Sequence, residues 1–273
     1  MRKRGLLLCL ALLLVLCQGC TWPHKKTVTI GGQSVTIDPS VPENNLNASD
    51  FSQQEDGKVV YTGGKYLTGI DVSAHQGKIN WKKVAKQVDF AMIQAGYRGY
   101  TEGKLAEDER FRENIQQALK YKLKVGVYFF SQAVTVEEAQ QEAYLLLEWI
   151  KDYDITYPVV FDWESVNDED SRTKDTDGET VTKCALAFCK IIEDAGYLPM
   201  TYGSPSKVYA DGIQLEYLQD YPFWLAHYTK DWEPTSFRYH YDMWQYSSTG
   251  SVPGIEGNVD LDLCLTDFSQ WNR

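Results

Sequence analysis

Two acidic residues separated by one position end an apolar segment in the middle of the chain. Asp162 and Glu164 follow the run Pro158-Val159-Val160-Phe161. Because alternate residues of a strand point to the same side, with Cα atoms roughly 6.5 Å apart, the two carboxyl groups would share one small space. Carboxyl groups that close resist double ionisation, so one of them tends to keep its proton. A protonated acid beside an ionised one is what glycosidic bond cleavage requires.

Two further acids lie at the ends of other predicted strands, since Asp71 follows residues 67–70 and Asp260 follows Asn258-Val259. A charge at the end of a buried strand is costly unless it is paired or has a function. In a barrel of parallel strands, such ends meet at one opening. The predicted catalytic residues are therefore Asp71, Asp162, Glu164 and Asp260. Carboxylates can also bind a hard divalent cation, but no His or basic residue is placed to complete a two-metal site, and we expect neither a metal nor a cofactor.

The chain is rich in aromatic residues, with 8 Trp and 18 Tyr. Sugar rings stack on aromatic faces, and the polar tips of Tyr and Trp can hydrogen-bond to hydroxyl groups. Several such residues, and one Gln, fall on predicted strands near the opening. The predicted substrate-binding residues are Tyr128, Tyr202, Trp224, Tyr228, Trp244 and Gln245. Packing in the core is the competing interpretation for the aromatic residues, and a hydrogen bond to the backbone is the competing one for Gln245.

The segments that would position these residues alternate between apolar strands and amphipathic helices from Tyr66 onward. The expected strands cover residues 67–72, 90–96, 125–130, 157–164, 198–202, 223–228, 243–247 and 258–263. The expected helices cover residues 81–87, 108–122, 135–153 and 179–195. Repeated strand–helix units require a parallel sheet with helices outside it. The predicted fold class is therefore α/β, a barrel related to the eight-stranded kind, with its site at the carboxyl ends of the strands.

Motifs of this domain follow one another in a recognisable order. They include Gly69-Ile70-Asp71-Val72-Ser73, Val159-Val160-Phe161-Asp162-Trp163-Glu164, Trp244-Gln245-Tyr246-Ser247-Ser248 and Gly257-Asn258-Val259-Asp260-Leu261. Each motif alone is weak evidence, but together they resemble glycoside hydrolase family 25, the Chalaropsis-type lysozymes. The resemblance covers about residues 66 to 268.

The resemblance implies a TIM-like barrel of five β/α units plus three further strands. It also implies hydrolysis of the β-1,4 bond between N-acetylmuramic acid and N-acetylglucosamine in peptidoglycan. By position, Glu164 would be the general acid and Asp162 would support the substrate acetamido group or the transition-state charge. Asp71 and Asp260 would complete the acidic pocket. Two alternatives stay open: a non-catalytic wall-binding protein on the same fold, which the intact acids disfavour, and a chitinase-like glucosaminidase.

The first twenty residues have the pattern of an export signal. Basic residues at positions 2–4 precede an apolar run from Gly5 to Leu16, which is shorter than the roughly 20 residues of a membrane span. The following Cys17-Gln18-Gly19-Cys20 resembles a bacterial lipoprotein cleavage site. We expect residues 1–20 to be a signal peptide and Cys20 to be lipidated, so that the exported protein is anchored at the cell envelope. A soluble secreted protein and an uncleaved anchor are the alternatives.

Residues 21–65 are polar and rich in turn residues. We expect them to form a tether between the membrane and a barrel domain at residues 66–273. A small hairpin packed on that domain is the alternative.

The remaining cysteines and the charge exclude other classes. Cys184, Cys189 and Cys264 are odd in number and lack zinc-ligand spacing, so we expect buried thiols. A net charge of -11 argues against nucleic-acid binding, which needs a basic face. The expected partners are peptidoglycan glycan strands and the membrane, and we expect a monomer.

Overall fold

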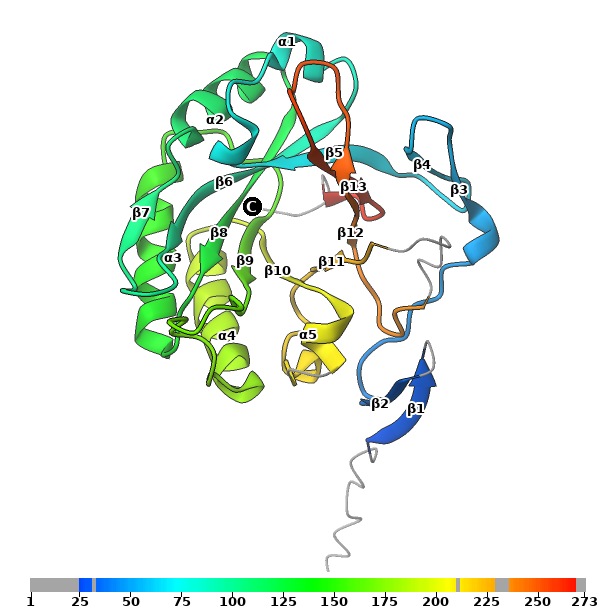
Figure 1. The fold of residues 1–273 in the computed structure, drawn as a ribbon, viewed down its shortest axis with the longest axis vertical. Coiled ribbons are helices and arrows are strands. Elements are labelled where there is room, and N and C mark those ends of the chain that lie inside the picture. Colours follow the sequence, from blue (N-terminus) through cyan, green and yellow to red (C-terminus); the bar gives the residue numbers. More distant parts are fainter. Residues whose placement is uncertain (1–24, 31–32, 210–211, 229–235, 269–273) are drawn as a thin grey trace, which may run out of the picture.

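The computed structural model describes residues 25–30, 33–209, 212–228 and 236–268 (Figure 1). The predicted signal peptide at residues 1–20 and the predicted lipidation site Cys20 lie outside these ranges. Within the described ranges, no helix has both the length and the apolar character needed to cross a membrane.

A closed barrel of eight strands forms the centre of the described part of the chain (Figure 1). The first seven of these strands run parallel to one another, and the eighth runs antiparallel between the seventh and the first and closes the ring. In chain order they are β5 (Leu67–Val72), β6 (Phe90–Arg98), β8 (Lys124–Ser131), β9 (Val159–Trp163), β10 (Pro199–Gly203), β11 (Phe223–Ala226), β12 (Met243–Gly250) and β13 (Val259–Cys264). The short β7 (Leu105–Glu107) pairs with the end of β6. The predicted α/β class and the barrel are confirmed, and the predicted strand bounds agree to within three residues.

Helices follow β5, β6, β8, β9 and β10 in the chain. They are α1 (Trp81–Val84), α2 (Phe111–Lys120), α3 (Val136–Ile150), α4 (Gly178–Asp194) and α5 (Pro205–Tyr209). The two longest begin at side-chain caps, because the hydroxyl of Thr135 and the carboxylate of Asp177 accept hydrogen bonds from backbone N–H groups of the first turn. Since α1 and α5 have only 4 and 5 residues, α2, α3 and α4 provide most of the helical cover, along one side of the barrel (Figure 1).

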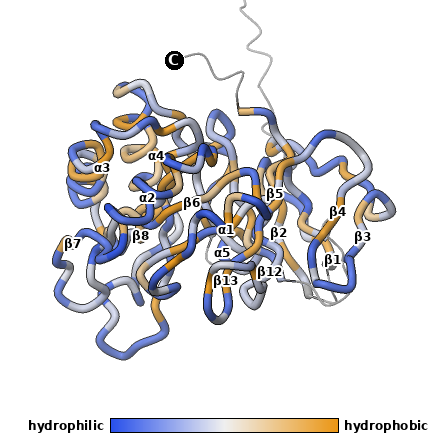
Figure 2. Tube along the Cα trace, turned by 90° about the horizontal axis from the view of Figure 1, so that it is seen from above, coloured by the Kyte–Doolittle hydropathy of each residue, from blue (hydrophilic) through white to orange (hydrophobic). Residues whose placement is uncertain are grey.

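The barrel wall separates two apolar layers. Residues between the strands and the helices form one layer, which includes Phe161 and Trp163, whereas Val160 belongs to the layer inside the barrel. The alternation along β9 therefore directs Asp162 inward, and Trp163 points outward as predicted, where its Nε1 donates to Ala133 O at 2.9 Å. Figure 2 shows apolar residues concentrated along β6. Three buried free thiols, as predicted, are Cys184, Cys189 and Cys264.

The segment before the barrel is packed rather than free. Two hairpins precede β5, one formed by β1 (Lys26–Ile30) and β2 (Gln33–Ile37), the other by β3 (Phe51–Gln53) and β4 (Val59–Tyr61). Val59 is 1% exposed, and the Phe51 ring meets the Trp244 ring edge-on at 5.8 Å.

Backbone hydrogen bonds also join this segment to the barrel domain. Asn44 N donates to Arg238 O and His240 N donates to Pro42 O, each at 2.8 Å. The prediction of a free tether over residues 21–65 is therefore wrong for residues 41–61, which pack on the domain as the alternative proposed. The physical reason is that a few apolar residues spaced along a polar segment are enough to bury one side of it.

Candidate active site

A cleft opens at the carboxyl ends of the parallel strands and has a volume of about 660 Å³. All four predicted catalytic acids line it, namely Asp71, Asp162, Glu164 and Asp260. Of the predicted substrate-binding residues, Tyr128, Tyr202, Trp224, Tyr228 and Gln245 also line it. The topology explains this convergence, because β5 and β9 end at the cleft and the antiparallel β13 begins there, with Asp260 paired beside Asp71.

Burial dominates the electrostatics of the four acids. It raises the pKa of Asp162 and of Asp71 well above the ordinary value, and neighbouring negative charges add to the effect: Glu164 and Asp71 act on Asp162, and Asp260 acts on Asp71. Burial raises the pKa of Asp260 to about 6. Burial also raises the pKa of Glu164, although the positive charge of Lys207 lowers it. The cleft therefore opposes simultaneous ionisation of its four carboxyl groups.

The hydrogen bonding of the Asp162 carboxyl group is incomplete. Asp162 is 5% exposed, and within the described part of the protein its Oδ1 atom is buried without a hydrogen-bond partner. A buried polar atom in this state costs free energy. The Asp162 residue lines the cleft.

Gln245 connects the acids to the tyrosines. Its Oε1 accepts hydrogen bonds from the hydroxyls of Tyr202 at 2.9 Å and Tyr228 at 2.5 Å. Its Nε2 donates to Asp71 Oδ2 at 2.7 Å. Gln245 is therefore bonded to side chains rather than to the backbone, and it holds Asp71 in place. Tyr228 is 51% exposed, so its ring remains available to a ligand.

The structure does not bring Trp244 into the cleft, so the prediction that it contacts substrate is wrong. Trp244 is 0% exposed and packs outside the barrel wall against Phe51 and Tyr246, where its Nε1 donates to His227 O at 2.9 Å. Its neighbour Gln245 points inward, and adjacent residues of a strand point to opposite faces. Trp224, in contrast, lies inside the barrel, with its ring edge-on to Tyr202 at 5.0 Å.

Sequence reasoning missed two residues that affect the site. Asp262 is 0% exposed inside the barrel, and Trp224 Nε1 donates to its Oδ1 at 2.9 Å. Its spacing of two from Asp260 on the same strand was a usable signal. Lys207 on α5 donates to Ser165 Oγ, and its ammonium lies over the Trp163 ring at 5.6 Å. No strand pattern could indicate this residue, because it comes from a helical turn after β10.

Comparison with known proteins decides the family. The sequence profile described as "Glycosyl hydrolases family 25" matches residues 70–255. The chain belongs to glycosyl hydrolase family 25. It is thus a glycoside hydrolase, as the motifs indicated.

Curated relatives of this family 25 enzyme cover most of its barrel. It is 31% identical over 200 residues to the uncharacterized protein YegX of Escherichia coli O157:H7, covering 72% of this chain and 69% of that protein. It is 30% identical over 210 residues to Lysozyme M1 of Streptomyces globisporus, covering 71% of this chain and 66% of that protein.

Solved structures share the fold of the family 25 enzyme. The modular autolysin LytC of Streptococcus pneumoniae superposes with a TM-score of 0.64 at 24% identity, over 87% of this chain. The present chain spans only 57% of LytC. The lysozyme of Streptomyces coelicolor superposes with a TM-score of 0.55 at 24% identity, over 72% of this chain and 90% of that one.

Gln132 of the family 25 enzyme is fully buried and holds the main chain at Glu164 by hydrogen bonding. Its amide nitrogen donates to Glu164 O at 2.5 Å and to Ser131 O at 2.9 Å. Arg172 in turn donates to Gln132 O at 2.8 Å and to Glu138 Oε1 at 2.6 Å. These bonds join the end of β8, the start of α3 and the loop after β9, so they fix where the Glu164 side chain begins.

The acids of the family 25 enzyme are arranged for proton transfer. Among the residues that the structure describes, no cluster of three or more His, Cys, Asp or Glu side chains is arranged to hold a metal ion. What the arrangement offers is proton donation from a buried carboxyl group, together with negative charge nearby to stabilise a cationic transition state.

Proposed function

We propose that this family 25 enzyme is a peptidoglycan hydrolase that cleaves the β-1,4 bond between N-acetylmuramic acid and N-acetylglucosamine. The observation that carries the proposal is the convergence of four carboxyl groups in one cleft. Asp162 and Glu164 come from β9 and its end, Asp71 from β5 and Asp260 from β13. The relatives support it, because one is named a lysozyme and LytC has been solved with a synthetic peptidoglycan ligand.

In this proposal, Glu164 is the general acid. Burial raises the pKa of Glu164, which makes its proton more available to the leaving glycosidic oxygen than that of an exposed Glu would be. Once the proton has left, the new carboxylate is stabilised by the nearby positive charge of Lys207. The Gln132 hydrogen bond to the Glu164 backbone keeps the acid in register with the bond that it protonates.

Asp162 and the remaining acids act on the sugar that becomes positively charged. The unpartnered Oδ1 of Asp162 can accept the N–H of the substrate's 2-acetamido group or face the oxocarbenium-like centre. Asp71 and Asp260 add negative charge on the opposite strands. The half-exposed ring of Tyr228 provides a stacking surface for a neighbouring sugar.

The experiment uses purified peptidoglycan and the whole protein. Clearing of a peptidoglycan suspension is followed as turbidity, and the released ends are reduced with borohydride and weighed by mass spectrometry. We expect reduced N-acetylmuramic acid ends. We also expect Glu164→Gln to lower kcat by about 10²–10⁴-fold without changing the thermal unfolding midpoint.

Other outcomes separate the competing functions. Reduced N-acetylglucosamine ends would identify a glucosaminidase. Binding to peptidoglycan without clearing would identify a docking protein. An active Glu164→Gln variant would remove Glu164 from its proposed role.

We further propose that residues 1–20 direct export and that a lipid on Cys20 anchors the protein, as a monomer, at the cell envelope. The support is the Cys17-Gln18-Gly19-Cys20 motif after a basic and apolar leader. Because residues 41–61 pack on the barrel, residues 21–40 would be the part of the chain that links a lipid at Cys20 to the domain. Labelling of the protein by a fatty-acid analogue, lost in Cys20→Ala, tests this; unchanged labelling or unchanged membrane attachment contradicts it.

A further inference from the structure

A line of hydrogen bonds crosses the barrel interior below the cleft and contains one carboxyl group to which no role has been assigned. Asp262 lies on β13, opposite Gly69 of β5 and two residues after Asp260. It is 0% exposed, so solvent cannot compensate either of its oxygens. Its partners must therefore come from the protein itself.

One oxygen of Asp262 has a donor and the other has none. Trp224 Nε1, which can only donate, bonds to Asp262 Oδ1 at 2.9 Å. Within the described residues, Asp262 Oδ2 is buried without a partner. The Asp71 carboxyl is the diagonal cross-strand neighbour of Asp262 on the inner face of the barrel, because Asp71 pairs with Asp260 and Asp262 pairs with Gly69. A hydrogen bond between the two acids shifts the pKa of each, lowering that of Asp71 and raising that of Asp262. Two carboxyl groups can bond to each other only if one carries a proton.

The neighbouring hydrogen bonds and the burial of Asp71 and Asp262 indicate which of the two acids carries the proton. Gln245 Oε1 already accepts two hydroxyl hydrogen bonds, so its amide nitrogen must face Asp71 and donate to Oδ2. Asp71 is thus held as an acceptor from this side. A carboxylate at Asp71 accepts from both Gln245 and Asp262 and lines the cleft. A proton on Asp71 would instead place the negative charge of the pair on Asp262, which is 0% exposed.

Among the residues that the structure describes, the titratable groups that interact electrostatically with Asp262 include no cation. Those groups are Asp71, Asp260, Cys264, Tyr228 and Tyr246. Each is neutral or negative at neutral pH. An ionised Asp262 would therefore add an unpaired charge to a dry interior, which is strongly unfavourable.

We propose that Asp262 is a positioning residue that stays protonated and donates its O–H to Asp71, so that Asp71 remains the ionised member of the pair. The polarity of the whole line is then fixed, with Trp224 donating to Asp262, Asp262 to Asp71, and the tyrosines through Gln245 to Asp71. This holds one negative charge at a defined place in the floor of the cleft. The catalytic consequence rests on the proposed function, but the position of the proton does not.

The chemical test uses Asp262→Asn, whose side chain reproduces the proposed pattern. The amide nitrogen can donate to Asp71 and the amide oxygen can accept from Trp224, with no titratable proton. We expect kcat/KM on peptidoglycan within about threefold of the wild type and an unchanged pH profile. Asp262→Leu, which can do neither, should lose at least about tenfold in kcat.

The outcomes are decisive in both directions. An Asp262→Asn variant as impaired as Asp262→Leu would mean that a negative charge at Asp262 is needed, and the proposal would fall. Unfolding of Asp262→Asn, seen as loss of the near-ultraviolet circular dichroism, would also overturn it, because the amide satisfies each of the proposed bonds.

Infrared spectroscopy measures the proton without relying on activity. The difference spectrum between the wild type and Asp262→Asn at neutral pH should contain the carbonyl stretch of a protonated carboxylic acid. A carboxylate band in its place would show that Asp262 is ionised and would overturn the proposal. If the protein did not hydrolyse peptidoglycan at all, this measurement would still decide where the proton lies.

Discussion

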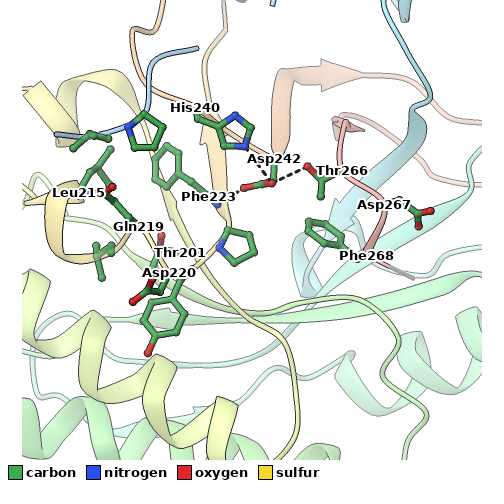
Figure 3. A pocket seen from close by; sticks show the side chains of 15 residues that line it. Thr201, Leu215, Gln219, Asp220, Phe223, His240, Asp242, Thr266, Asp267 and Phe268 are labelled. Atoms are coloured by element: carbon green, nitrogen blue, oxygen red, sulfur yellow. Dashed lines mark hydrogen bonds and ion pairs between the residues drawn. The ribbon is translucent and has the colours of Figure 1, made fainter. Parts of the chain in front are cut away.

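The two ends of the barrel differ in the hydrogen bonds that they provide to a largely buried aspartate. At the end away from the cleft, Asp242 lies in the wall of a cavity of about 410 Å³ (Figure 3). Its side chain, 13% exposed, accepts hydrogen bonds from Phe223 N at 3.0 Å and Thr266 Oγ1 at 2.7 Å, and it lies 3.4 Å from His240 Nε2. Burial alone would raise its pKa, but the bonds from His240, Thr266 and Phe223 together hold the pKa below the ordinary value.

At the cleft, Asp162 has the same chemistry and less solvent, yet the fold supplies no donor to its Oδ1. Its pKa is raised because burial and the charges of Glu164 and Asp71 all oppose ionisation. The contrast teaches that burial by itself does not identify a functional acid. What separates the structural aspartate from the one proposed to act on substrate is whether the fold has satisfied its oxygens.

Replacing each of these two aspartates by asparagine tests the difference between them most directly. Asp242→Asn keeps the shape but puts an amide against backbone and hydroxyl donors, so we expect it to lower the free energy of unfolding by about 1–3 kcal/mol. Asp162→Asn removes a charge that has no partner, so we expect it to raise the free energy of unfolding by roughly 0.5–2 kcal/mol. The same change should lower kcat by about 10²-fold or more, because the site loses charge that stabilises the transition state.

Urea unfolding and peptidoglycan clearing, measured on both variants, check this pair. Each variant serves as the control for the other, since both are Asp→Asn changes in the wall of the same barrel. Folded Asp242→Asn should retain wild-type kcat. A less stable but fully active Asp162→Asn variant would show that Asp162 has a structural role rather than the proposed catalytic one.

The pH dependence of stability should also differ between the two ends. A carboxyl group whose pKa is raised in the native state stabilises the fold below the unfolded pKa, and this contribution is lost as pH rises through the native pKa. For Asp260, with a native pKa of about 6, the loss should extend from about pH 4 to about pH 6. Asp242 behaves oppositely: its contribution is present above the unfolded pKa and is lost as the pH falls through its lowered native pKa.

Thermal unfolding midpoints across this pH range provide the measurement. Asp260→Asn should flatten the decline between about pH 4 and pH 6 and leave the acid side unchanged. Asp242→Asn should instead remove part of the loss of stability at acid pH. If Asp260→Asn left the profile between these values as steep as in the wild type, Asp260 would not be a group whose ionisation the fold opposes.

Strand periodicity explains which parts of the site the sequence could predict. The alternation along β9 placed Asp162 and Glu164 on one side and Trp163 on the other, and the structure has Asp162 and Trp163 on opposite faces of the wall. The same rule, applied to β12, excludes Trp244 once Gln245 points inward. Applied to β13, it would have placed Asp262 inside with Asp260.

Other features had no local signal in the sequence. The packing of residues 41–61 depends on contacts between Phe51 and Trp244, which are nearly two hundred positions apart. The support of Glu164 by Gln132 is a side-chain bond to a backbone carbonyl, and such bonds leave no periodic pattern. Lys207 reaches the acids from the single turn of α5, whose direction only the closed barrel determines.

Lys207 provides the finest comparison, because it lies near Glu164 as His240 lies near Asp242: each is a basic side chain beside a largely buried acid. Its positive charge lowers the pKa of Glu164. Lys207→Met should therefore raise that pKa, and since the general acid must be protonated, the alkaline limb of the kcat–pH profile should move to higher pH. Lys207→Arg should restore the wild-type limb. Lys190→Met, which removes an exposed lysine paired with Asp194 on α4, is the matched control and should leave the limb in place. A shift to lower pH in Lys207→Met, or an equal shift in the control, would mean that Lys207 does not act on Glu164 through its charge.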